Sequence, residues 1–157
     1  MFQILVVEDD KDLNRTVCAF LNASGYRATD CLSAGEAYDA MYDEVFDLIV
    51  SDIMMPGIDG FEFAKTVRSL NENIPILFMT ERDDFASKQR GYRIGVDDYM
   101  VKPRDLHGFE RIFSSAGSFS PLKYIRYSFS LKTSCKQKSS IQNCKALQSE
   151  RFFCKTR

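Results

Sequence analysis

Hydrophobic and polar positions follow two alternating periods along the first 103 residues. Short runs in which every position is apolar, such as Ile-Leu-Val-Val at 4–7, are typical of strands covered on both faces. Segments with apolar residues at helical spacing separate these runs. The predicted strands are 4–7, 26–31, 48–50, 74–79 and 99–101, and the predicted helices end near residues 23, 44, 70 and 91.

The expected helix starts carry residues that can cap free backbone N–H groups. Asp10 or Asp12 can cap the first helix, and Ser33 can cap the second. The third and fourth helices are expected at 61–70 and 84–91. The residues expected to face the core are Leu13, Val17, Phe20 and Leu21 in the first helix and Ala37, Ala40 and Met41 in the second.

Strands that alternate with helices of about 10–15 residues indicate βαβ units and a mainly parallel sheet. Five such units within about 100 residues predict a compact, doubly wound α/β domain. No internal repeat interrupts the pattern.

Unusual polar residues stand directly after the predicted strands. Glu8 and Asp9 follow the first strand, Asp52 the third, Thr80 the fourth and Lys102 the fifth. The carboxyl ends of parallel strands share one edge of a sheet, and ligands bind there. The pattern therefore predicts that three carboxylates, a hydroxyl and an ammonium group converge.

Carboxylates crowded into one site raise one another's pKa, and a nearby lysine or a hard cation relieves the repulsion. Mg²⁺ prefers oxygen ligands and commonly shares a phosphate oxygen. A carboxylate can also attack phosphorus to form an aspartyl phosphate. A cation, a hydroxyl and an ammonium together neutralise the charge of a transferring phosphoryl group. The predicted cluster suits that chemistry.

Four sequence runs resemble those of response-regulator receiver domains in their order and spacing. They are ILVVEDD at 4–10, DLIVSDIMMPGIDG at 47–60, ILFMT at 76–80 and DDYMVKP at 97–103. The resemblance covers about residues 1–116. It implies a flavodoxin-like fold with a five-stranded parallel sheet in the order 2-1-3-4-5.

The resemblance also implies a phosphoacceptor and a metal site. Asp52 matches the residue that accepts a phosphoryl group from a sensor histidine kinase. The implied ligands of Mg²⁺ or Mn²⁺ are Glu8, Asp9, Asp52 and the backbone carbonyl of Met54. The implied function is phosphorelay signal transduction in a two-component system, with regulation of transcription as an expected output.

Three further residues match the family's switch. Thr80 corresponds to the hydroxyl that binds the phosphoryl group, and Lys102 to the lysine that pairs with the acceptor and then with the phosphate. Tyr99 corresponds to the aromatic residue whose orientation follows the switch. Pro103 follows Lys102 as in the family, where that peptide bond is often cis.

Alternative functions on this topology stay open. Aspartyl-phosphate-type phosphatases use a nucleophilic Asp but need a second Asp two residues later, where this chain has Met54. A flavin-binding module would need a Ser/Thr/Gly-rich phosphate loop after the first strand, which is absent. Glu81 stands where the family has a small residue, so an inactive pseudo-receiver that acts as an interaction module is a third alternative. The preferred interpretation is a phosphoacceptor that is not an enzyme, with at most self-catalysed phosphotransfer and autodephosphorylation.

Composition and charge change where the resemblance fades. Residues 1–103 hold 10 Lys/Arg and 19 Asp/Glu, a net charge of −9, whereas 104–157 hold 11 and 3, a net charge of +8. The second part also has ten serines and no valine. We therefore expect a receiver domain at 1–116, with a fifth helix near 105–113, and an irregular, basic Ser/Cys-rich tail at 117–157 that is poorly ordered.

Three interpretations of the tail stay open. In the first, the tail comes from an altered reading frame or a truncated gene of a DNA-binding response regulator. In the second, it is a basic arm that binds acidic partners or nucleic acid by charge. In the third, it is an ordered appendage. No recognisable DNA-binding output domain is present in its sequence. The face formed by the fourth helix, the fifth strand and the fifth helix is the implied homodimer interface.

Cysteine usage and hydropathy bear on the compartment. The five cysteines form no C-x-x-C pair, and the single histidine, His107, has no ligand at zinc spacing. Scattered thiols of odd number are typical of a reducing compartment. No apolar run approaches the ~18 residues of a membrane span, and the N-terminus has no secretory pattern. We therefore expect a cytoplasmic protein without membrane partners.

Overall fold

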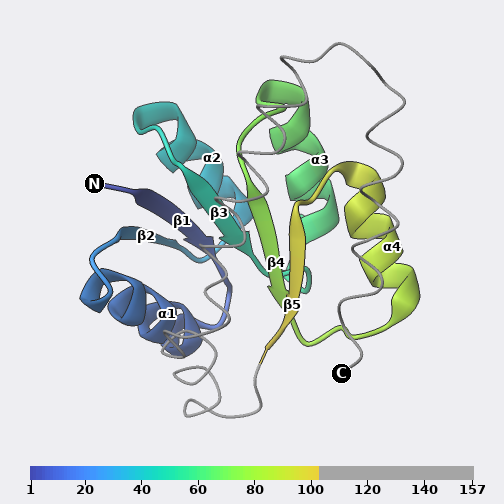
Figure 1. Cartoon of the computed structure of the whole chain (residues 1–157), viewed down its shortest axis with the longest axis horizontal. Coiled ribbons are helices and arrows are strands. Elements are labelled where there is room, and N and C mark those ends of the chain that lie inside the picture. The colour runs from blue at the N-terminus through green and yellow to red at the C-terminus, as the bar shows by residue number, and fades with distance from the viewer. Residues whose placement is uncertain (103–157) are drawn as a thin grey trace, which may run out of the picture. The chain divides into compact units, whose positions relative to one another are not determined.

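The computed structural model describes residues 1–102, which form a five-stranded parallel sheet with four helices (Figure 1). The order of the strands across the sheet is β2-β1-β3-β4-β5, as the resemblance implied. Every pair of neighbours is parallel. The strands are β1 (Gln3–Val7), β2 (Arg27–Cys31), β3 (Leu48–Ser51), β4 (Ile76–Thr80) and β5 (Asp98–Val101).

Each of these helices begins at a side-chain cap, which explains where the chain turns from loop to helix. Asp10, rather than Asp12, caps the first helix, because its carboxylate accepts from the backbone N–H groups of Asp12 and Leu13. A cap of this kind contributes about 1 kcal/mol. The helices and their caps are α1 (Lys11–Ala23, Asp10), α2 (Ala34–Asp43, Ser33), α3 (Gly60–Leu70, Asp59) and α4 (Phe85–Ile94, Asp84).

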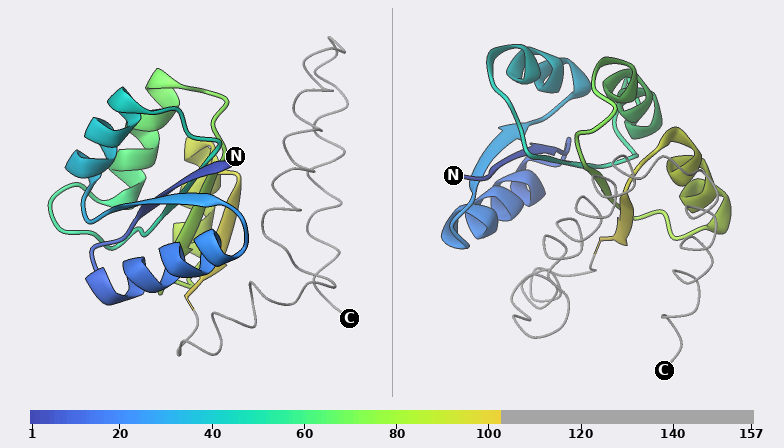
Figure 2. Two further views of the ribbon diagram at one scale, coloured as in Figure 1. Left: turned by 90° about the vertical axis from the view of Figure 1, so that its left-hand side faces the viewer. Right: turned by 45° about the horizontal axis from the view of Figure 1, so that its top comes forward.

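The sheet separates two layers of helices. Figure 2 shows α1 on one side of the sheet and α2 and α3 on the other. Successive side chains of a strand point to opposite faces, so Leu5 and Val7 join the core cluster with Ala37 of α2 and Val67 of α3. Four consecutive residues of β1, from Ile4, are fully buried. This burial explains the unbroken apolar runs from which the strands were predicted.

The buried stripe of α1 differs from the predicted one. Val17 and Leu21 are buried as expected, but Leu13 and Phe20 are only half-buried. The stripe in contact with the sheet is Asn14, Val17, Cys18 and Leu21, at spacing i, i+3, i+4 and i+7. The prediction was wrong because it excluded a polar residue from the inner face.

The predicted inner face of α2 is confirmed in part. Ala37 is fully buried, whereas Ala40 and Met41 are half-buried and pack against the edge of the core cluster. The same cluster buries Ala34, the first residue of α2.

The predicted end of α4 was also wrong. The helix continues past Gly91 to Ile94 and ends at Gly95, which takes the left-handed conformation with φ of 99°. A Cβ at Gly91 would approach the ring of Phe78 to 3.3 Å, so a glycine suits this position inside the helix. The glycine therefore allows α4 to lie closely against β4.

Several predictions lie outside the described residues 1–102. These are the fifth helix, the tail at 117–157, the peptide bond before Pro103 and the part of the dimer face that the fifth helix would form. None of the helices between residues 1 and 102 combines the length and the apolar content that a bilayer crossing requires.

Candidate functional site

The register of the strands brings their carboxyl ends to one rim of the sheet. Val7 of β1 pairs with Ser51 of β3, and Thr80 of β4 pairs with Val101 of β5. Backbone hydrogen bonds continue this order past the strand ends, because the N–H of Lys102 donates to the carbonyl of Thr80 at 2.8 Å. The residues that follow the strands therefore lie along one rim of the sheet, as predicted.

A single ammonium group joins two buried carboxylates at the rim. Nζ of Lys102 lies 2.7 Å from Oδ2 of Asp52, and 2.8 Å and 2.6 Å from the two carboxylate oxygens of Glu8. Glu8 is 1% exposed and Asp52 is 3% exposed. In the sequence, Lys102 is 94 positions from Glu8 and 50 positions from Asp52. The three residues nevertheless form one ionic cluster that is screened from water.

Burial and charge shift the protonation of this cluster. Burial raises the pKa of Glu8 to about 7, with a further rise from the charge of Asp52, although the hydrogen bond from Lys102 lowers it. Burial alone would lower the pKa of Lys102. Its hydrogen bonds to Asp52 and Glu8 outweigh that effect and raise the pKa, so the ammonium stays charged.

Backbone N–H groups fix the carboxylate of Asp52. Its Oδ1 accepts from the N–H of Ile53 at 2.5 Å and from the N–H of Met54 at 3.1 Å. Gly60 at the start of α3 packs against the same peptide, since a Cβ on Gly60 would lie 2.1 Å from the carbonyl oxygen of Asp52. Only glycine fits there, and the close approach of α3 holds the acceptor in place.

The acidic residues provide a donor set for a hard cation. Glu8, Asp9 and Asp52 each offer one carboxylate oxygen within 4.8 Å of the others, and Asp9 is exposed. Oε2 of Glu8 is buried and receives no directed hydrogen bond from any residue within 1–102, although Nζ of Lys102 is close. Carboxylate oxygens are the ligands that hard cations prefer, so this donor set fits Mg²⁺ or Mn²⁺.

Thr80 and Tyr99 both contact the loop between β4 and α4. Thr80 is fully buried, and its hydroxyl accepts from the N–H of Arg82 at 3.4 Å. Tyr99 is 7% exposed, and its hydroxyl donates to the carbonyl of Arg82 at 2.7 Å. Burial raises the pKa of Tyr99 to about 12, so this hydroxyl keeps its proton. The predicted roles of both residues in switching stay predictions, as does the carbonyl of Met54 as a ligand.

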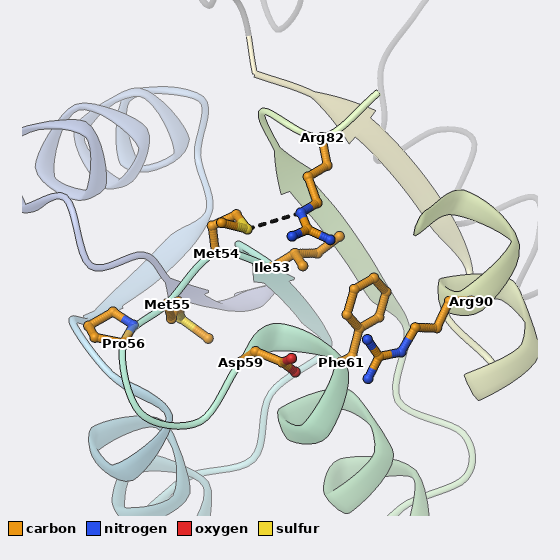
Figure 3. A pocket seen from close by; sticks show the side chains of 8 residues that line it. All are labelled: Ile53, Met54, Met55, Pro56, Asp59, Phe61, Arg82 and Arg90. Carbon is orange, nitrogen blue, oxygen red and sulfur yellow. Dashed lines mark hydrogen bonds between the residues drawn. The ribbon is translucent and has the colours of Figure 1, made fainter. Parts of the chain in front are cut away.

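A pocket of about 450 Å³ lies beside the loop that follows β3 (Figure 3). Nε of Arg82 donates to the thioether sulfur of Met54 at 3.0 Å, which links the loop after β4 to the loop after β3. Arg90 of α4 stacks on the ring of Phe61, with its guanidinium carbon 4.2 Å from the ring centre. The residues that line the pocket are Ile53, Met54, Met55, Pro56, Asp59, Phe61, Arg82 and Arg90.

Two residues at the site were missed by the sequence analysis. Arg82 contacts Met54, Thr80 and Tyr99, but an arginine in a loop of unknown path carries no signal. Asn14 is fully buried beside the end of β1. Its helical spacing from Val17 is visible in the sequence, but the two backbone carbonyls that it binds are not.

Comparison with known sequences identifies the family. The sequence pattern of the response regulator receiver domain matches residues 4–112. The chain belongs to the response regulator receiver domain family, whose members are the receiver domains of two-component systems. This is the family that the four sequence runs indicated.

Proteins that are similar in sequence to this chain include regulatory proteins. The chain is 38% identical over 101 residues to the regulatory protein VanRB of Enterococcus faecalis, covering 64% of this chain and 46% of that protein. It is 41% identical over 102 residues to the transcriptional regulatory protein RprY of Bacteroides fragilis, covering 64% and 43%. The chain therefore spans less than half the length of these relatives.

Solved structures share the fold. The chemotaxis response regulator CheY4 of Vibrio cholerae is 31% identical, with a TM-score of 0.65 over 73% of this chain and 97% of that one. The response regulator TrrA of Thermotoga maritima, solved in complex with Mg²⁺ and BeF, is 27% identical. Its TM-score is 0.62 over 71% of this chain and 95% of that one.

Proposed function

We propose that this chain is a phosphorylation-controlled switch in which Asp52 accepts a phosphoryl group from the phosphohistidine of a sensor histidine kinase. The observation that carries the proposal is the ammonium of Lys102 between the buried carboxylates of Asp52 and Glu8. Burying charged groups costs free energy, and buried groups with shifted pKa values are concentrated at functional sites. The fit of the acidic residues to a hard cation supports it further.

In the proposed reaction a carboxylate oxygen of Asp52 attacks the phosphorus. A bond forms between that oxygen and phosphorus, the bond from phosphorus to the histidine nitrogen breaks, and the nitrogen keeps the electron pair. Lys102 supplies a positive charge 2.7 Å from the acceptor carboxylate, which offsets the negative charge that the phosphoryl group adds. The two backbone N–H groups on Oδ1 hold the carboxylate in one orientation during attack.

Glu8, Asp9 and Asp52 would hold a divalent cation, with the Met54 carbonyl as a further proposed ligand. Such a cation neutralises charge on the phosphoryl oxygens when it is bound. On the protein side, Glu8 must be ionised to bind it. The pKa of about 7 places this requirement close to neutral pH.

The signal would pass through the loop that Thr80, Tyr99 and Arg82 share. In the proposed switch the hydroxyl of Thr80 binds a phosphoryl oxygen and leaves the N–H of Arg82. The hydroxyl of Tyr99 holds the next carbonyl group of that loop, so a movement of Arg82 reaches β5. The altered surface of α4 and β5 would then change affinity for a partner or a second copy of the chain.

The proposed output is regulation, since relatives such as RprY are named transcriptional regulators. The proposed setting is the cytoplasm, where a kinase and its receiver meet. We also propose that residues 117–157 form an arm that binds nucleic acid by charge, because their net charge is positive.

The test uses Mg²⁺, a small acyl phosphate and the intact mass of the full chain. We expect one phosphoryl adduct that is stable in acid, is lost in base and requires Mg²⁺. It should vanish in Asp52→Asn and persist in Asp47→Asn. Asp47 is a matched control because it stands before β3 as Asp52 stands after it, at the other end of the strand.

The other outcomes point to the alternative functions. Continuous release of phosphate without an adduct would indicate a phosphatase. No adduct and no release would indicate a pseudo-receiver that acts as an interaction module. An adduct that persists in Asp52→Asn would refute the assignment of the acceptor.

A further inference from the structure

Asn14 is a buried polar residue on the inner face of α1, where the neighbouring stripe residues are apolar. Its side-chain amide donates to two backbone carbonyls, that of Glu8 at 3.0 Å and that of Cys31 at 2.8 Å. Its amide oxygen accepts from the thiol of Cys18 at 3.4 Å. The residue is 0% exposed, so all of these bonds form away from water.

These partners determine which way the amide points. Carbonyl oxygens accept only, so the NH₂ end of Asn14 must face Glu8 and Cys31. The thiol of Cys18 then serves the other end as a donor. Burial raises the pKa of the Cys18 thiol to about 12, which keeps its proton available. Both the nitrogen and the oxygen of the side-chain amide therefore form hydrogen bonds, as is typical of a buried polar residue.

The amide lies where the ladder between β1 and β2 ends. The last bond of that ladder runs from the N–H of Glu8 to the carbonyl of Cys31 at 3.0 Å. The same carbonyl also accepts from Asn14, which additionally binds the carbonyl of Glu8. The backbone of Glu8 is thus held at its N–H by Cys31 of β2 and at its carbonyl by Asn14 of α1.

Asp9 follows Glu8 directly, so this anchored segment carries two of the three acidic residues, Glu8 and Asp9. Glu8, Asp9 and Asp52 each offer a carboxylate oxygen within 4.8 Å of the others, so the position of the segment that carries Glu8 and Asp9 sets the geometry of the donor set. A side-chain hydrogen bond from Asp10 N–H to Glu8 is long, at 3.4 Å, and gives weak restraint. The amide of Asn14 is a buried side-chain attachment of this segment to α1.

We infer that Asn14 is a positioning residue for the divalent-cation site, acting through the backbone of Glu8 on the carboxylates of Glu8 and Asp9. The inference rests on the proposed function, because it concerns the same site. Partners that orient metal ligands typically contribute about 10- to 100-fold to affinity. Asn14→Leu, of similar size but without donors, should therefore weaken Mg²⁺ binding at least about tenfold.

The experiment titrates Mg²⁺ into the full-length chain by calorimetry and measures the unfolding free energy without metal. A merely structural role would lower stability and leave the Mg²⁺ affinity of the folded protein unchanged. Val17→Ala provides that comparison, since Val17 is fully buried one turn further along the same stripe. We expect Val17→Ala to lose stability and to bind Mg²⁺ like the wild type, whereas Asn14→Leu loses both.

Two further variants make the result decisive. Asn14→Ser is smaller and more polar than Leu, so it provides a folded protein if the leucine variant fails, and the same loss of Mg²⁺ affinity is expected. Asn22→Ala removes an asparagine that also joins α1 to β2, by accepting from the N–H of Ala28 at 2.9 Å, but far from the rim. It should leave Mg²⁺ binding unchanged.

The outcomes separate the two proposals. A wild type that binds Mg²⁺, with folded Asn14 variants that bind it equally well, would overturn this inference and leave the proposed function standing. A wild type that binds no Mg²⁺ would overturn both. A loss of affinity in Val17→Ala as large as in Asn14→Leu would also overturn the positioning role.

Discussion

Replacement of Glu8 by glutamine tests whether the ionic cluster at the rim is as costly as its burial implies. Glu8→Gln keeps the size of the side chain and removes its ability to ionise. The wild-type carboxyl has a pKa of about 7 in the folded protein, against an ordinary value of 4.5. Folding therefore favours the protonated form of Glu8.

The sign of the pH effect follows from that difference. A group whose pKa is higher in the folded state contributes stability that is fully present below its unfolded pKa and is lost as the pH rises through its folded pKa. For Glu8 the window runs from pH 4.5 to about 7. At about 1.4 kcal/mol for each pH unit, the loss amounts to about 3 kcal/mol of unfolding free energy.

The assay is urea unfolding of both proteins at several pH values in the presence of a chelator. Far-UV circular dichroism is the suitable probe, because the chain has no tryptophan. The difference in unfolding free energy between Glu8→Gln and the wild type should move by about 3 kcal/mol in favour of the variant between pH 4.5 and 7. Glu72→Gln, which removes an exposed carboxyl before β4, is the matched control.

A difference between Glu8→Gln and the wild type that stays constant across this window would refute the reasoning. It would mean that the ammonium of Lys102 fully compensates the burial of the carboxylate. The opposite trend, with the wild type gaining on the variant as pH rises, would refute the direction of the pKa shift.

Three other results are expected. The Mg²⁺ affinity of the wild type should rise with pH and level off above about pH 7, because Glu8 must lose its proton, and calorimetry of Glu8→Gln should show no such rise. Gly60→Ala should lose about 3 kcal/mol or more in urea unfolding, since its Cβ would lie 2.1 Å from the carbonyl oxygen of Asp52, whereas Gly35→Ala has room and should not. Lys102→Met should lose about 3–5 kcal/mol at pH 8 by leaving two buried carboxylates without their cation, and Mg²⁺ should restore part of that loss.

The sequence was sufficient to predict the sheet and the convergence at its rim. Strands buried on both faces are unbroken apolar runs, so β1 and β3 could be located without the structure. The residues that follow the strands meet because parallel strands end at one edge. Glu8, Asp52 and Lys102 could therefore be grouped before any distance was known.

Other features depend on packing that the sequence does not express locally. The inner face of α1 includes Asn14, whose amide donates to two carbonyls at the ends of β1 and β2. These contacts appear only when three elements are assembled. The contact between Arg82 and Met54 likewise depends on the paths of two loops. The close contact between Gly91 and the ring of Phe78 also depends on how α4 packs against β4.

The central claim, that Asp52 is the phosphoryl acceptor, is tested most directly by locating the modified residue. The chain is treated with Mg²⁺ and a small acyl phosphate and then reduced with borohydride, which converts an aspartyl phosphate to homoserine. Peptide mass spectrometry then identifies the converted residue. We predict homoserine at position 52 alone; conversion at Asp9 or at another carboxylate, or at none, would contradict the account.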